Sequence, residues 1–221
     1  STAEKSDGVI IVTNNLRKNR SEMGLDLRPV VITGFDMPGE TCVLNDDYGC
    51  MKGAIQYLYE NGHKKVGFIS QPISHQTVGE RYRGFLDGIR EYNLTPVDEL
   101  VYVNEMTDGE INNLIKGMMS KGMDSLILSN LFVPAISNEL KKLNVSIPND
   151  ISILVFNDFE DKPMIDAGYS VIQSRRFEMG RAAVRTLIQL INGEIESGTK
   201  QIIPTRLIEG RTVRKNREGY C

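Results

Sequence analysis

Short apolar runs alternate along the chain with longer segments in which apolar residues recur every three or four positions. The runs are rich in β-branched residues and are flanked by turn residues, which is typical of strands. Several runs are apolar at every position, and this indicates strands covered on both faces, as in a parallel sheet. The expected strands are 9–12, 30–32, 42–44, 66–69, 100–103, 125–128, 151–156, 170–172 and 202–208.

Five helical patterns lie between these runs. In the first, Met51, Ala54, Ile55 and Leu58 fall on one helical face. The sequence Thr-Asp-Gly-Glu at 107–110 has the spacing of a capping box, which opens a helix. The expected helices are 47–61, 77–92, 107–122, 134–143 and 175–192. Strand–helix alternation of this kind predicts an α/β fold with mostly parallel sheets.

Composition and charge narrow the class of protein. The formal net charge is −3, and the chain lacks the basic stripe expected of a free-standing DNA binder. Its three cysteines, Cys42, Cys50 and Cys221, have no paired spacing, which argues against a disulfide framework and for a reducing compartment. The sequence contains no apolar run of roughly 20 residues and no signal peptide, so we expect a cytoplasmic protein without a membrane partner.

Sequence signatures of catalysis and cofactor binding are missing. The chain contains neither a Gly-rich phosphate loop nor a Gly-x-Ser-x-Gly turn. His63 and His75 do not have metal-ligand spacing. We therefore expect a binding module with no metal and no cofactor, rather than an enzyme.

Five sequence blocks follow one another along the chain. They are NDDYGCMKGAIQYLYENGHKKVGFIS at 45–70, TVGERYRGFLDGI at 77–89, VSIPNDISILVFND at 145–158, FEMGRAAVRTLIQLINGE at 177–194 and IIPTRLIEGRTV at 202–213. As an ordered set, these blocks resemble the lactose-repressor (LacI/GalR) family of bacterial transcription regulators. The resemblance implies two Rossmann-like parallel-sheet subdomains of the type I periplasmic-binding-protein-like fold, with crossings near Asn61, Gln173 and Pro204. The N-terminal subdomain would comprise residues 1–61 and 174–204, and the C-terminal subdomain residues 62–173 and 205–221.

The resemblance also places the start of this sequence at the third strand of the first subdomain. A helix-turn-helix head, a hinge and two strand–helix units would then precede it, and the first subdomain would be truncated at its N-terminus. The implied function is allosteric. A sugar or related metabolite would bind in the cleft between the subdomains and change the operator affinity of a homodimer through the missing DNA-binding head.

Arg81 is the foremost candidate for an effector contact. It lies at the edge of the apolar stripe of helix 77–92, and its planar fork of donors suits vicinal hydroxyls or a phosphate; the matching family arginine contacts the effector. A surface arginine facing Glu80 or Asp87 is the alternative. Thr77 matches a ligand-contacting position, but it could equally form a capping box with Glu80.

Further candidates follow from the family pattern, and some of them have a structural alternative. Asn157 replaces a family aspartate that often bonds the effector, and it could instead form an Asx turn. Met106 stands where the family often has a stacking aromatic residue. The remaining candidates are Asn130, which matches a family Asn; His75, on the loop before the helix; and Tyr48 and Asp46, from the first subdomain, of which Asp46 could instead be an N-cap.

Two other functions stay open at the level of sequence. A periplasmic sugar-binding protein of a transporter would share the two-lobed architecture, and the upstream sequence would distinguish it. An α/β enzyme acting on sugar phosphates could use the same cleft, but it would need an acid–base pair that the sequence does not offer.

Overall fold

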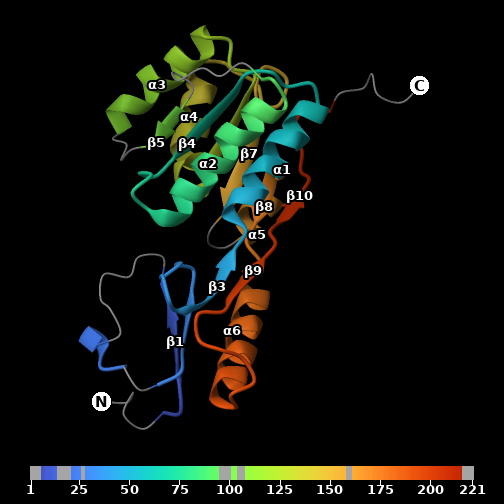
Figure 1. Cartoon of the computed structure of the whole chain (residues 1–221). Coiled ribbons are helices and arrows are strands. Elements are labelled where there is room, and N and C mark those ends of the chain that lie inside the picture. Colours follow the sequence, from blue (N-terminus) through green and yellow to red (C-terminus); the bar gives the residue numbers. More distant parts are fainter. Residues whose placement is uncertain are drawn as a thin grey trace. The chain divides into compact units, whose positions relative to one another are not determined.

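The apolar runs form two separate sheets, each covered by helices (Figure 1). The computed structural model describes residues 6–13, 21–25, 28–94, 101–103, 108–157 and 161–215. Among these, the residues up to Asp46, His75–Thr77 and Arg175–Thr205 form a smaller unit. Asp47–Ser74, Val78–Ser174 and the residues from Arg206 onward form a larger unit. This alternation of strands and helices confirms the α/β prediction.

The larger unit is built on a six-stranded sheet of order β10-β8-β7-β6-β4-β5. All neighbouring pairs are parallel except β10 and β8. In spatial order the strands are β10 (Arg206–Ile208), β8 (Ser170–Gln173), β7 (Ser152–Asn157), β6 (Ser125–Ser129), β4 (Val66–Ser70) and β5 (Val101–Val103). The central strands β4 and β6 are buried along their whole length, as expected for strands covered on both faces.

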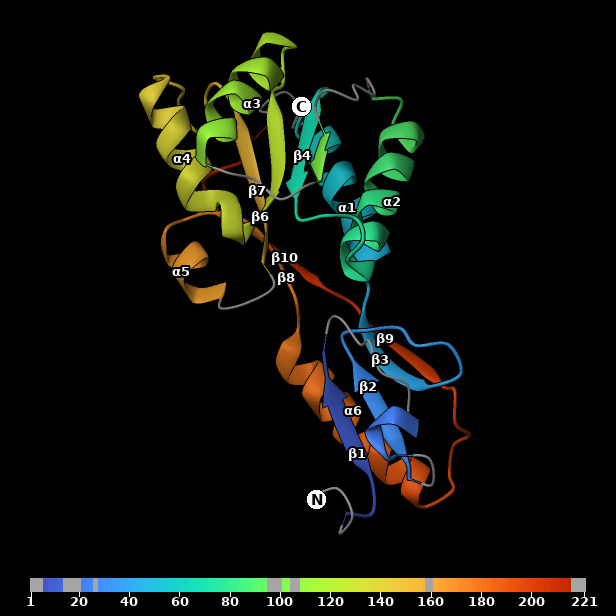
Figure 2. The same ribbon diagram turned by 90° about the vertical axis from the view of Figure 1, so that its left-hand side faces the viewer.

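Two pairs of helices cover the two faces of this sheet, as Figure 2 shows. α1 (Asp47–Glu60) and α2 (Gln76–Glu91) pack in one core with Phe68, Phe156 and Ile172. α3 (Asp108–Ser120) and α4 (Val133–Lys142) pack in a second core on the opposite face. A 3-10 turn, η4 (Asn130–Phe132), leads into α4, and α5 (Asp161–Asp166) precedes β8.

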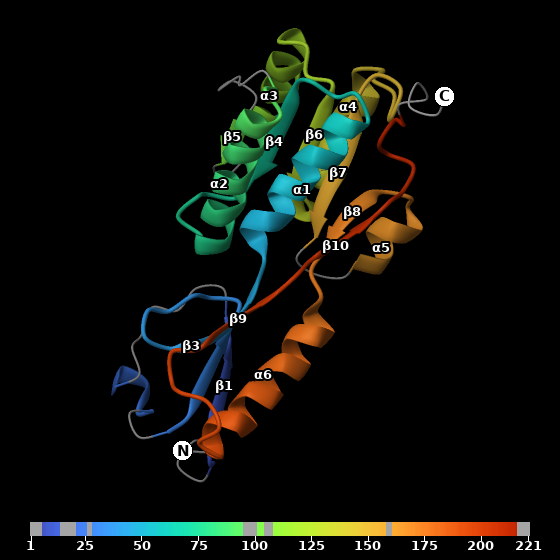
Figure 3. The ribbon, with the colours of Figure 1, turned by 45° about the vertical axis from the view of Figure 1, so that its right-hand side comes forward.

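The smaller unit is a parallel four-stranded sheet of order β1-β2-β3-β9. The strands are β1 (Val9–Val12), β2 (Val30–Thr33), β3 (Thr41–Asn45) and β9 (Lys200–Ile203), and η2 (Ser21–Met23) is a short 3-10 turn. α6 (Arg176–Ile191) contacts all four strands, and Figure 3 shows it running beside them. Its residues Met179 and Ala183 pack with Val31 and Val43 in the core of this unit.

The run predicted as one strand, 202–208, is two strands, because β9 pairs with β3 of the smaller unit and β10 with β8 of the larger unit. The resemblance implies a first subdomain that extends to residue 61, whereas the contacts of α1 group it with the larger unit from Asp47 onward. The reason is that Met51, Ile55 and Leu58 share a core with β4 and α2.

The helices of the described part of the chain include none that combines the length and apolarity of a membrane span.

Candidate ligand-binding site

Polar residues end three of the parallel strands of the larger unit. β4 ends at Ser70, β6 at Ser129 and β7 at Asn157. Because these strands are parallel neighbours, their carboxyl ends meet at one edge of the sheet. Ligands of open α/β sheets bind outside this edge, so it is where a site is expected.

Arg81 lies within the first two turns of α2, yet only 3% of its surface is exposed. Its Nε donates a hydrogen bond of 2.8 Å to Oδ1 of Asp47, the first residue of α1. Its guanidinium carbon also lies 3.5 Å from the centre of the Phe156 ring on β7, a cation–π contact. A buried charge of this kind requires such partners, and together they fix the plane of the guanidinium group.

Close packing of α1 against α2 brings Arg81 and Asp47 together. A Cβ atom placed on Gly84 of α2 would lie 2.3 Å from the carbonyl oxygen of Tyr48, and one on Gly88 would lie 2.9 Å from the Ile55 side chain. Only glycine permits this approach. The Arg-x-x-Gly-Phe motif therefore places its arginine at the site, its glycine at the helix crossing and Phe85 in the core.

Two buried polar atoms next to this edge have no partner within the described residues. They are Oγ of Ser129, at the end of β6, and Oδ1 of Asn130, the first residue of η4. Buried polar atoms are nearly always hydrogen-bonded, so an unpaired one indicates a place where a ligand or water supplies the missing bond. The Asn130 oxygen accepts a bond and therefore requires a donor group.

The other predicted residues lie in varied surroundings. The hydroxyl of Tyr48 donates to Asp87, 3.1 Å away, and its ring carries Arg83 at 4.6 Å, so α2 already engages this side chain. Asp46 directly precedes α1 and its backbone N–H bonds to Ile203 of the smaller unit. The backbone of Asn157 ends β7, and Met106 lies outside the described residues.

His75 and Thr77 are half-buried and group with the smaller unit. The capping box proposed for Thr77 is not formed. α2 begins before it, at Gln76, and Glu80 forms an ion pair with Arg83 instead. Gln76 uses its side chain to bond the backbone of Asp36, also in the smaller unit.

Sequence reasoning missed Asp47, Ser129 and Phe156. Asp47 directly follows Asp46, so this pair of acidic residues was the sequence feature that could have identified it. Which of the two carboxylates contacts Arg81 depends on where α1 begins. Phe156 was visible as an apolar strand residue, but its contact with Arg81 depends on the packing of α2 over β7.

His63, which lies between α1 and β4 in the sequence, is buried and contacts Asp124. Burial alone would raise the pKa of Asp124. The bonds from His63 and from the backbone N–H groups of Lys64 and Lys65 outweigh it and lower that pKa. Nowhere in the described ranges do three potential metal ligands cluster.

The fold and this site define a binding domain with parallel α/β units. The sequence profile of the family described as the periplasmic binding protein-like domain matches residues 55–213, and the chain belongs to this family.

The curated relatives are transcription repressors. The chain is 22% identical to the HTH-type transcriptional repressor PurR of Aliivibrio salmonicida, over 86% of this chain and 59% of the relative. It is also 22% identical to the ribose operon repressor of Lactococcus lactis, over 95% of this chain and 64% of the relative. The chain thus spans less than two thirds of the length of these relatives.

A solved structure of a LacI family transcriptional regulator from Enterococcus faecium with bound ribose has the same fold. It aligns with a TM-score of 0.78 at 18% identity, covering 98% of this chain and 83% of that one.

Proposed function

We propose that this chain is the effector-sensing part of a bacterial transcription regulator of the LacI type. The observation that carries the proposal is the buried Arg81, fixed by Asp47 and Phe156 at the carboxyl edge of the larger sheet. The names of the relatives support it, because they are transcription repressors, including PurR, CytR and the ribose operon repressor.

The effector we propose is a sugar or a related polyhydroxylated metabolite. The site holds the Arg81 guanidinium, fixed by Asp47 and Phe156, and a buried Asn130 oxygen that has no partner among the described residues. Each hydroxyl group of a sugar both donates and accepts, so vicinal hydroxyls match this mixture. Several structurally similar regulators were solved in complex with such ligands, namely ribose, cellobiose and D-xylulofuranose.

Signalling would follow from a difference in the effector's affinity for two arrangements of the units. We propose that the effector binds at the carboxyl edge of the larger sheet, with Thr77, His75, Asn157, Met106 and Tyr48 as further contacts. A ligand can shift such an equilibrium only as far as it prefers one arrangement. In the whole regulator, which we propose to be a cytoplasmic homodimer, the shift would alter operator binding by a helix-turn-helix head.

The first test is a thermal-shift screen of the chain with D-ribose, D-xylulose, cellobiose and their phosphates. A ligand at a hundred times its Kd stabilises the folded state by about 2.7 kcal/mol, which raises the melting temperature by several degrees. The stabilisation should disappear in R81M and persist in R90M, which changes an exposed arginine on the same helix. The proposal fails if no compound stabilises the chain, or if R81M responds as the unchanged chain does.

The comparisons favour this function over the two alternatives. The curated relatives are repressors rather than transport proteins, which speaks against a transporter component. Their names also describe regulators rather than enzymes, and we propose that the site binds its ligand without turnover.

A further inference from the structure

The charge of Arg81 is already balanced within the larger unit. Its Nε lies 2.8 Å from Oδ1 of Asp47, and the two side chains are only 3% and 8% exposed. The centre of the Phe156 ring lies 3.5 Å from the guanidinium carbon. An arginine that binds a phosphate presents its planar fork of donors to the phosphate oxygens in bidentate geometry. Here the Nε edge of that fork faces a carboxylate of the chain itself.

Asp47 also occupies the start of α1. The first turn of a helix has free N–H groups and a partial positive charge, so it attracts anionic ligands. Asp47 is the first residue of α1 and the acidic residue of its first turn. One carboxylate therefore offsets two features that would otherwise attract an anion, namely the guanidinium group of Arg81 and the N-terminus of α1.

The buried Asn130 oxygen at the same edge of the sheet also favours an uncharged group. This Oδ1 atom accepts hydrogen bonds and has no partner among the described residues, so it requires a donor. A phosphate monoester at neutral pH presents negatively charged acceptor oxygens, which do not provide that bond. A sugar hydroxyl donates it.

We propose that Asp47 makes the effector site select uncharged polyols and reject their phosphate monoesters. A phosphate beside the Arg81–Asp47 pair would bring its negative charge close to the Asp47 carboxylate, and like charges in a poorly solvated site oppose binding. The selectivity rests on the proposed function, since it concerns the same site, and it adds the charge of the effector and the residue that sets it. Asp47 acts through Arg81, as a positioning residue whose role is electrostatic.

The test compares each sugar with its own phosphate. D-ribose, D-xylulose and cellobiose, their phosphate monoesters and the dimethyl triesters of these monoesters are titrated into the chain by isothermal titration calorimetry. The triester is larger than the monoester but carries no charge. It therefore separates an effect of charge from an effect of size.

The variants remove the charge of Asp47 in two ways. D47N keeps the shape of the side chain and an oxygen acceptor for Arg81. D47S leaves more room, so that the test does not depend on the folding of one variant. D166N makes the same change as D47N at an exposed residue of α5 and is the matched control. Far-UV circular dichroism verifies that each variant is folded.

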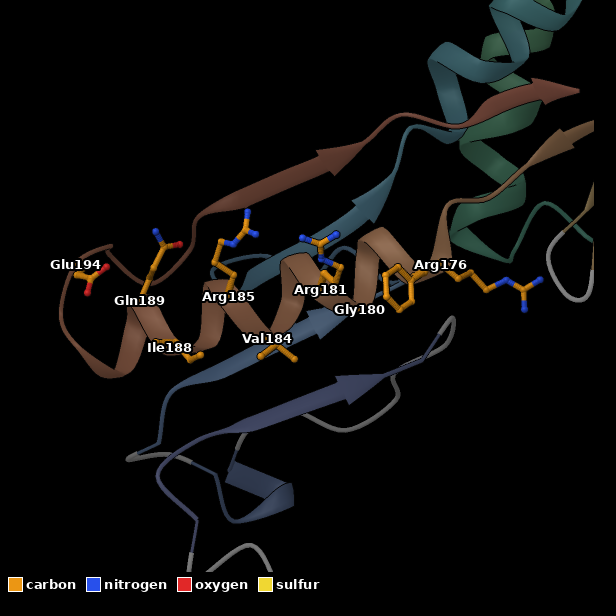
Figure 4. Close-up of a pocket in the computed structure, with 9 residues that line it drawn as sticks. Arg176, Gly180, Arg181, Val184, Arg185, Ile188, Gln189 and Glu194 are labelled. Atoms are coloured by element: carbon orange, nitrogen blue, oxygen red, sulfur yellow. The ribbon is translucent and has the colours of Figure 1, made fainter.

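Exposed arginines in the smaller unit require a further control. Arg176, Arg181 and Arg185 line a groove along α6, as Figure 4 shows. A phosphate attracted to them would be counted as binding at the effector site. The titrations are therefore repeated with R181Q/R185Q, and monoester binding that is lost in this variant is assigned to α6.

The unchanged chain and D166N should bind a sugar about tenfold or more tightly than its monoester, and the triester more tightly than the monoester. In D47N and D47S the preference for the sugar should fall about tenfold or more, because the phosphate then supplies the negative charge that Arg81 has lost.

Three results would overturn the selectivity and leave the proposed function standing. They are a monoester that binds the unchanged chain as tightly as its sugar, a triester rejected as strongly as the monoester, and an unchanged preference in the Asp47 variants. The first two use only the unchanged chain, so they decide even if both variants unfold. If none of the compounds binds the unchanged chain, the proposed function and the selectivity both fail.

Discussion

Helices α2 and α6 have the same length, 16 residues, and they depart from ordinary helix patterning in opposite ways. α2, in the larger unit, buries an arginine. α6, in the smaller unit, exposes a phenylalanine and three β-branched residues. Both departures conflict with the rule that charged residues face water and apolar residues face the core.

The two helices differ in where the compensation lies. The buried charge of Arg81 is compensated inside the larger unit by Asp47 and Phe156. The exposed stripe around Phe177 has no apolar cover among the residues described. Departures from local rules concentrate at functional sites, so the buried Arg81 indicates a site that is already assembled.

The largest effect is expected from R81M. The substitution leaves the Asp47 carboxylate buried without its cation, and breaking a buried ion pair in this way costs about 3–5 kcal/mol. Urea unfolding followed by far-UV circular dichroism measures the loss, since the chain has no tryptophan.

The double variant D47L/R81M is the control for this substitution. It removes both charges, so it should be less destabilised than R81M alone. If R81M unfolds at the same urea concentration as the unchanged chain, Asp47 does not compensate the buried charge of Arg81. α2 would then not differ from α6 in the way described.

A pair of glycine substitutions sharpens the same comparison. G84A would push a methyl group to 2.3 Å from the Tyr48 carbonyl oxygen, and overpacking of this kind costs about 2–3 kcal/mol. G180A on α6 meets nothing within 4 Å, and alanine stabilises a helix interior by about 0.5–1 kcal/mol relative to glycine.

Opposite shifts of the unfolding midpoint are therefore expected for the two glycines. Equal shifts would mean that α2 is not packed more closely than α6, contrary to the structure.

The sequence predicts the elements of both units well because their apolar periodicities are strong and their ends carry turn residues. It misses the short helix Asp161–Asp166, which is too short for a periodic pattern. It also merges β9 and β10, because a run containing Pro204 reads as one strand until its two halves are seen to pair with different sheets.

The site was predictable only in part. Arg81 stood out because a charged residue beside an apolar stripe conflicts with helix patterning. Whether Asp46 or Asp47 contacts Arg81 depends on the residue at which α1 begins. Apolar periodicity does not fix that boundary to within one residue. Ser129 and Asn130 became candidates through burial without a partner, a property of packing rather than of sequence.

A half-buried carboxylate elsewhere in the larger unit, that of Asp124, makes stability depend on pH. In D124A, His63 and the backbone N–H groups of Lys64 and Lys65 lose their acceptor, at an expected cost of about 1–2 kcal/mol at pH 7. Because the pKa of Asp124 is lowered in the folded state, its stabilisation is present above its ordinary pKa and is lost as pH falls through the lowered value.

Urea unfolding from pH 7 to pH 3 measures this dependence. The difference between D124A and the unchanged chain should shrink toward pH 3. In D166A, which removes only an exposed pair with Lys162, the difference should be small throughout. A difference between D124A and the unchanged chain that stays constant with pH would show that the charge of the Asp124 carboxylate does not contribute to stability.

The smallest effect is expected from F177S on α6. Phe177 is 76% exposed, so its replacement by serine should change the free energy of unfolding by less than about 0.5 kcal/mol. F85S on α2 is the matched control. It removes a phenylalanine that is 3% exposed and stacked on Phe68, and it should be strongly destabilising. If F177S destabilised the chain as F85S does, Phe177 would be packed within the chain itself. The α6 face would then be part of a core, and the contrast with α2 would not hold, because α6 would not expose an apolar stripe.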